Sequence, residues 1–186
     1  YTERKYSAST GIDLPLFSLG TSMKVYSFRA PEVGIEGEDA FAYGLGWDLG
    51  LLAEPIKGLS LGGSALDIRG SSINWSNTNS QPTDIIPSRY LAGFSYKTPF
   101  LNTLLTAQYK YSPQLKEELS FGIEYSVFLL RLRGGFVKPI PGEISFTAGA
   151  GLRYKPIKID IAWVQNKTLI GKNVQDSIIL SGEFWF

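Results

Sequence analysis

The chain has 186 residues, of which 44% are hydrophobic and 19% charged, and this length suits one domain spanning 1–186. Lys and Arg number 18 and Asp and Glu 17, so the net charge of +1 gives no reason to expect a nucleic-acid partner. The sequence has no histidine and no cysteine, which removes His-dependent nucleophilic catalysis, thiolate metal sites and disulfide scaffolds. We expect a chain that is not an enzyme and that binds no metal and no cofactor.

Alternation of apolar and polar residues at period two recurs from Leu16 to Phe186 and predicts about ten β-strands. In 59–69 the alternation changes phase near Ala65, which a β-bulge would explain. In chain order, the predicted strands are 17–28, 41–51, 59–69, 90–97, 102–111, 119–126, 130–133, 143–154, 157–163 and 177–186.

The length of these segments matches the roughly 9 to 11 residues that a tilted strand needs to cross a bilayer. No stretch without charged residues is long and apolar enough for a spanning helix. With the C-terminus on the periplasmic side, the connections 29–39, 70–88, 112–115, 138–141 and 165–175 would be extracellular. The short turns 54–57, 98–101, 127 and 155–156 would be periplasmic, the arrangement of outer-membrane barrels.

Aromatic residues provide a further indication, because rings gather at the two interfaces of a membrane barrel. With the strand orientation given above, the residues predicted near the outer rim are Phe41, Tyr43, Tyr90, Tyr109, Tyr111, Phe136 and Trp163. Those predicted near the inner rim are Phe17, Tyr96, Tyr125, Tyr154, Phe184 and Phe186. The sequence therefore predicts an all-β protein, an antiparallel transmembrane β-barrel. The alternative is a soluble barrel of the lipocalin kind, in which the apolar face points inward.

Charged residues on the polar faces of the predicted strands would point into such a barrel. They form either a cross-strand network of salt bridges, which we favour, or a polar permeation path. Arg131 and Arg133 are the expected exception to pairing, since they are like charges on one face of one strand. The candidate interior charges are Lys24, Asp48, Lys97, Lys110, Glu124, Arg131, Arg133, Arg153, Asp160 and Glu183.

The chain contains no recognisable catalytic motif. Gly44, Gly46 and Gly50, like Gly62 and Gly63, fall inside strand patterns with no helix after them, so they favour close packing over a phosphate-binding loop.

The last predicted strand ends in an aromatic C-terminus. Phe184 and Phe186 share one face and resemble the signal by which the barrel assembly machinery recognises its substrates through strand addition. The long connection 70–88 is rich in Asn and Ser and carries Trp75, which makes it either an external contact surface or a solvated loop.

Segments 17–28, 42–71, 86–100, 145–164 and 182–186 resemble the FadL-type outer-membrane protein superfamily, in particular its PorV-type branch. The resemblance covers most of the chain and rests on the order of strands and turns. It implies a fourteen-stranded barrel with an N-terminal hatch, of which this chain would supply the C-terminal portion. The alternative is a smaller barrel that closes on itself.

By this resemblance we expect a protein of the bacterial outer membrane that acts in transport or secretion. The PorV-like role would work through protein partners in a membrane complex, in contact with outer-membrane lipid. The alternative is a FadL-like channel for hydrophobic small molecules, which needs an apolar pocket and a lateral opening. A lumen packed with paired charges would favour the first role, and a continuous apolar cavity would favour the second.

Overall fold

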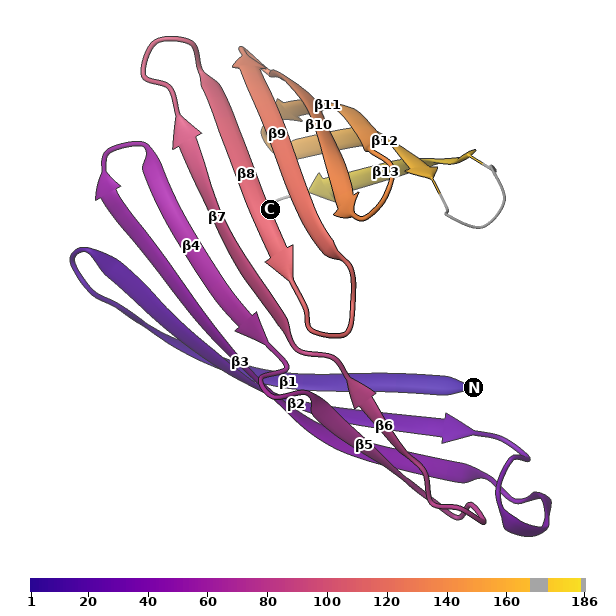
Figure 1. Cartoon of the computed structure of the whole chain (residues 1–186). Helices are drawn as coiled ribbons and strands as arrows, with labels where there is room; N and C mark the ends of the chain where they lie inside the picture. The colour runs from indigo at the N-terminus through magenta and orange to yellow at the C-terminus, as the bar shows by residue number, and fades with distance from the viewer. Residues whose placement is uncertain (168–173, 185–186) are drawn as a thin grey trace. The chain divides into compact units, whose positions relative to one another are not determined.

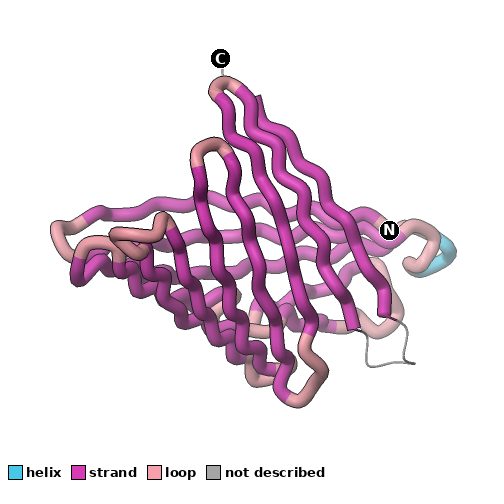
Figure 2. Tube along the Cα trace, turned by 90° about the horizontal axis from the view of Figure 1, so that it is seen from above, coloured by secondary structure: helices cyan, strands magenta, loops and turns pink. Residues whose placement is uncertain are grey.

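The structure, a computed structural model, describes residues 1–167 and 174–184. Within these residues the chain is almost entirely β-strand, with one short 3-10 helix, η1 (Ile35–Gly37) (Figure 2). None of the described segments forms a helix with the length and hydropathy needed to cross a membrane.

Thirteen strands are found in the described residues, and the pairs whose register is defined are all antiparallel. The all-β, antiparallel fold predicted from the sequence is therefore confirmed. The strands are β1 (Thr2–Asp13), β2 (Phe17–Ala30), β3 (Ala40–Ile56), β4 (Leu59–Leu66), β5 (Ser71–Ser76), β6 (Thr83–Ile86), β7 (Arg89–Lys97), β8 (Thr103–Tyr111), β9 (Glu117–Val127), β10 (Leu130–Ile140), β11 (Ser145–Tyr154), β12 (Ile157–Lys167) and β13 (Val174–Phe184).

The chain divides into two compact units, which are described separately. Unit 1 comprises 1–53, 62–91 and 111–115, and unit 2 comprises 54–61, 92–110 and 116–186. The expectation of a single domain over 1–186 stays a prediction.

Unit 1 is built on three long neighbouring strands, β1, β2 and β3 (Figure 1). The start of β3 also pairs on its other side with β5, over Phe41–Gly44, and β5 forms a hairpin with β6. In unit 2 the strands from β8 to β13 pair in chain order, each with the next.

The two faces of β3 differ sharply in exposure. From Phe41 to Leu51 its odd-numbered residues are large, apolar and exposed, as Leu45 (60%) and Trp47 (52%) show, whereas Ala40 and Ala42 on the other side are fully buried. We call the side carrying Phe41, Tyr43, Leu45, Trp47, Leu49 and Leu51, and the residues in register with them, the apolar face, and the opposite side the polar face.

The strands of unit 2 show the same division. Ile123 on β9 and Ile161 on β12 are half exposed, while their small and charged neighbours are less exposed. A water-soluble barrel of the lipocalin kind would bury these rows in its interior. Their exposure favours the membrane interpretation, because such a continuous apolar surface needs an apolar solvent.

Three of the observed strands were not predicted. β1 precedes the first predicted strand. β5 and β6 occupy the segment 70–88, so the prediction that this whole segment is a loop is wrong. In β5, Ile73 and Trp75 alternate with polar residues, but the strand is too short for this period-two pattern to be recognised in the sequence.

The predicted strand 59–69 ends earlier in the structure, and the bulge near Ala65 stays a prediction. β4 ends at Leu66, and the chain turns through Asp67, Arg69 and Gly70, which have φ values of 50°, 65° and 79°. Left-handed backbone conformations of this kind cannot continue a strand. The apparent change of phase thus lies next to the end of the strand.

We predict that Leu45→Arg destabilises the protein in a bilayer by about 2–4 kcal/mol, because a guanidinium near the membrane midplane is costly. Ser80→Arg, in the exposed turn between β5 and β6, should change the stability by less than about 0.5 kcal/mol. Urea titrations in lipid vesicles would measure both. Equal, small effects would contradict the assignment of the apolar face to lipid.

Candidate functional site

A buried carboxylate lies at the centre of the polar face of unit 1. The side chain of Asp67, in the turn after β4, is fully buried. Its Oδ1 accepts hydrogen bonds from the Tyr26 hydroxyl at 2.7 Å and the Ser71 hydroxyl at 3.0 Å. Its Oδ2 faces the Lys24 ammonium at 3.2 Å and the Arg89 guanidinium at 3.5 Å. All of its lone pairs are thus directed at donors, as a buried charge requires.

Asp48 completes the set of charges. Its Oδ1 lies 2.7 Å from Lys24 Nζ and accepts the backbone N–H of Asp67 at 2.9 Å. Two carboxylates therefore face two cations, and the group is electrically balanced. We call Lys24, Tyr26, Asp48, Asp67, Ser71 and Arg89 the Asp67 network.

Two glycines of β3 allow close packing here, Gly46 against the network and Gly44 against the start of β5. A Cβ on Gly46 would lie 2.5 Å from Ser71 Oγ and 2.6 Å from Asp67 Oδ1, and a Cβ on Gly44 would lie 2.6 Å from the Ser72 carbonyl oxygen. The close packing expected for these glycines is confirmed, and the turn after β4 packs directly on the strand backbone.

An aromatic cluster adjoins the network on the same face. Tyr26, Phe28, Ala42 and Ile73 are buried together, with Trp75 and Ile86 packed against them. The ring of Phe28 lies 6.5 Å from both the Tyr26 and the Trp75 rings, centroid to centroid. Tyr26 belongs to both groups, since its ring packs in the cluster while its hydroxyl donates to Asp67.

Trp75 itself lies in β5 and is half-buried. Its indole N–H donates to Asp84 Oδ2 at 2.7 Å, which fixes the ring. The prediction that it stands in an open loop is wrong, and its role in an external contact stays a prediction.

Unit 2 carries a ladder of ion pairs across its polar face. Arg133 donates to Glu124 Oε2 from Nε and to Asp160 Oδ1 from Nη1, both at 2.7 Å. Arg131 lies 3.8 Å from Glu124, so the prediction that Arg131 and Arg133 escape pairing is wrong. The reason is that Glu124 lies directly opposite Arg133 on the neighbouring strand β9, while Asp160 on β12 is reached across the glycines of β11.

The other predicted interior charges are found on the strands as follows. Lys158 lies 3.4 Å from both Asp160 and Glu183, and Lys110 lies 2.6 Å from Glu118. Arg153 also has an interaction partner, and the backbone N–H of Lys97 donates to the Gly58 carbonyl. Whether these residues line a common interior stays a prediction.

Phe184 is an exposed residue of β13. Phe186, the other residue of the predicted assembly signal, lies outside the described residues, and the recognition of this strand by the assembly machinery stays a prediction.

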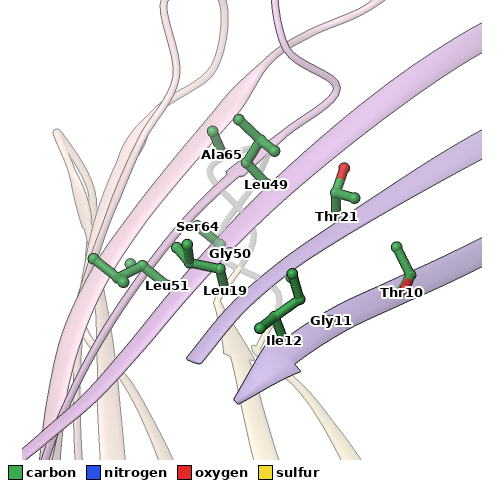
Figure 3. Close-up of a pocket in the computed structure, with 12 residues that line it drawn as sticks. Thr10, Gly11, Ile12, Leu19, Thr21, Leu49, Gly50, Leu51, Ser64 and Ala65 are labelled. Atoms are coloured by element: carbon green, nitrogen blue, oxygen red, sulfur yellow. The ribbon is translucent and has the colours of Figure 1, made fainter. Parts of the chain in front are cut away.

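The apolar face of unit 1 carries a shallow groove of about 530 Å³ (Figure 3). Ile12, Leu19 and Leu51 stand in register across β1, β2 and β3 along it. Among the described residues, no group of His, Cys, Asp and Glu side chains is placed to hold a metal ion.

Comparisons with known proteins give a likeness of fold. No protein-family model and no curated protein matches the sequence. The structure is similar to the crystal structure of the Ralstonia pickettii toluene transporter TbuX, with a TM-score of 0.61 and 14% sequence identity, over 99% of this chain and 69% of that chain. At this identity the likeness concerns the fold alone. It supports a FadL-like β-barrel fold, and nothing in the comparisons supports the PorV-type branch.

We predict that Asp67→Asn destabilises the protein by about 3 kcal/mol, because it leaves the buried Lys24 ammonium short of one negative charge. Glu183→Gln removes a carboxylate from a more exposed pair with Lys158 and should cost less than about 1 kcal/mol. Urea midpoints of the two variants would be compared. Similar midpoints would show that the network contributes no more than a surface pair.

A second test concerns the space beside β3. Gly46→Ala should destabilise by about 1–3 kcal/mol, since its methyl group would overlap the Asp67 and Ser71 oxygens. Gly182→Ala on β13, where no atom lies within 4 Å of the added Cβ, is the matched control and should be neutral or stabilising. A Gly46→Ala protein as stable as the control would contradict the packing described here.

Proposed function

We propose that the chain belongs to a β-barrel of the bacterial outer membrane that passes small hydrophobic molecules. The observation that carries this proposal is the aromatic cluster of unit 1. It places three neighbouring rings, Tyr26, Phe28 and Trp75, on a face that otherwise carries small and charged residues.

The fold likeness supports the proposal. TbuX is a toluene transporter, and toluene is a small aromatic hydrocarbon that stacks favourably on aromatic side chains. The exposed apolar face supports a location in a membrane, because strands of transmembrane barrels carry apolar residues toward lipid.

The residues would act by binding and orientation. The Tyr26 hydroxyl is held by Asp67 at 2.7 Å and the Trp75 indole by Asp84 at 2.7 Å, so both rings are fixed before any ligand arrives. Tyr26 and Phe28 are themselves buried, so the half-buried Trp75 ring is the part of the cluster that a ligand would contact, and a ring held in place binds at a lower entropic cost than a flexible one. No covalent step is involved.

The side chains of the polar faces do not by themselves decide between the two roles expected from the sequence. The ion pairs of both polar faces are the feature expected of a PorV-like role through protein partners, whereas the aromatic cluster is the feature expected of a hydrophobic channel. The fold likeness favours the channel, and the PorV-like role stays a prediction without support from the comparisons.

The test is uptake of radiolabelled toluene into vesicles containing the purified protein, measured against protein-free vesicles. Wild type should accelerate uptake, and Phe28→Ala should reduce the protein-dependent rate severalfold by removing the central ring of the cluster. Phe128→Ala, at a fully exposed ring between β9 and β10, is the control and should leave the rate unchanged. Wild-type uptake no faster than in protein-free vesicles would contradict the proposed function.

A further inference from the structure

A small pocket on the apolar face of unit 1 differs in chemistry from the rest of that face. It measures about 220 Å³ and is lined by Thr2, Arg4, Ser27, Arg29, Phe41 and Tyr43. We call it the arginine pocket. Its side chains carry two guanidinium groups, the aliphatic hydroxyls of Thr2 and Ser27, and the rings of Phe41 and Tyr43.

The strand register places these residues side by side. Thr2, Arg29 and Phe41 stand opposite one another across β1, β2 and β3, and Arg4, Ser27 and Tyr43 form the next row on the same face. Arg4 and Arg29 are diagonal neighbours on adjacent strands, which places their Cβ atoms within about 8 Å of each other. Two guanidinium groups at this spacing can converge on one anion.

The charges of the pocket are not fully balanced within the protein. Arg29 donates to Asp39 Oδ2 from Nε at 2.7 Å, with Nη2 at 2.5 Å from the same oxygen. This hydrogen bond holds the pKa of the Asp39 carboxyl below its usual range, so Asp39 is charged at neutral pH. Arg4 has no ion-pair partner among residues 1–167 and 174–184. The pocket therefore keeps a net positive charge.

The position along the strands fits a membrane interface. The Arg29–Phe41 row lies at the end of the β2–β3 hairpin, beside the connection 31–39. An arginine on the lipid face costs about 2–4 kcal/mol at the bilayer midplane but only about 0–1 kcal/mol near the interface. Exposed Phe41 and Tyr43 are residues of the kind that gather at this depth.

We propose that the arginine pocket binds the phosphate group of a membrane lipid. Guanidinium groups bind phosphate through paired, charge-assisted hydrogen bonds. The hydroxyls of Thr2 and Ser27 add donors, and the rings of Phe41 and Tyr43 contact the first carbons of the acyl chains. The inference rests on the membrane location in the proposed function, and it specifies a lipid contact that transport itself does not require.

The experiment uses purified protein in detergent and native mass spectrometry, with short-chain phosphatidate, phosphatidylcholine of the same chain length, and inorganic phosphate as probes. Wild type should retain phosphatidate about tenfold better than phosphatidylcholine, and Arg4→Gln should lose this preference. Arg4→Lys should keep most of it. Lys57→Gln, in the turn between β3 and β4, removes an exposed charge elsewhere and should leave it unchanged.

Equal retention of both lipids by wild type, or an unchanged preference in Arg4→Gln, would overturn the proposal. The proposal would also be overturned if inorganic phosphate bound as tightly as phosphatidate, because the site would then bind the free anion without any contribution from the lipid. Flotation with lipid vesicles separates this failure from that of the proposed function. A protein that floats with vesicles but shows no lipid preference contradicts the arginine pocket alone, whereas a protein that does not float contradicts the membrane location as well.

Discussion

The exposure of one apolar face is the constraint on which the other features depend. Along β3 every second residue from Phe41 to Leu51 is large, apolar and exposed, and the strands of unit 2 repeat the pattern. In water such a surface would drive association, because apolar area is costly to hydrate. Against lipid it has no such cost, and the polar groups are then confined to the opposite face, where they need partners.

The polar faces meet that need with balanced groups of charges. In unit 1 the buried Asp67 is surrounded by donors from β2, β5 and β7, and in unit 2 Arg133 joins carboxylates from β9 and β12. Removing one partner of such a pair costs more free energy than the intact pair contributes, because the remaining charge is then buried without a partner. The networks thus determine which strands and turns pack together. The Tyr26 hydroxyl links the Asp67 network to the aromatic cluster, because it donates to Asp67 while its ring packs in the cluster.

Much of the fold could be predicted from sequence because period-two alternation is long and regular in these strands. Lys24 and Asp48 could be assigned to the polar face by the same count, but Asp67 could not, because it belongs to a turn with left-handed backbone and not to a strand. The change of phase near Ala65 was the available indication of that turn. The hairpin of β5 and β6 and the pairing of Arg131 with Glu124 depend on contacts between strands, which period alone does not determine.

The most direct test of the central claim uses the absence of native cysteine. Single cysteines at Leu45 and Ile123 on the apolar faces, and at Ser9 on the polar face of unit 1, would be spin-labelled in lipid vesicles. Their accessibility to oxygen and to a water-soluble nickel complex would then be compared. Labels at positions 45 and 123 should meet oxygen far more readily than nickel, with the reverse at position 9. Labels at 45 and 123 that neither reagent reaches would place the apolar rows in a sealed interior and contradict the account.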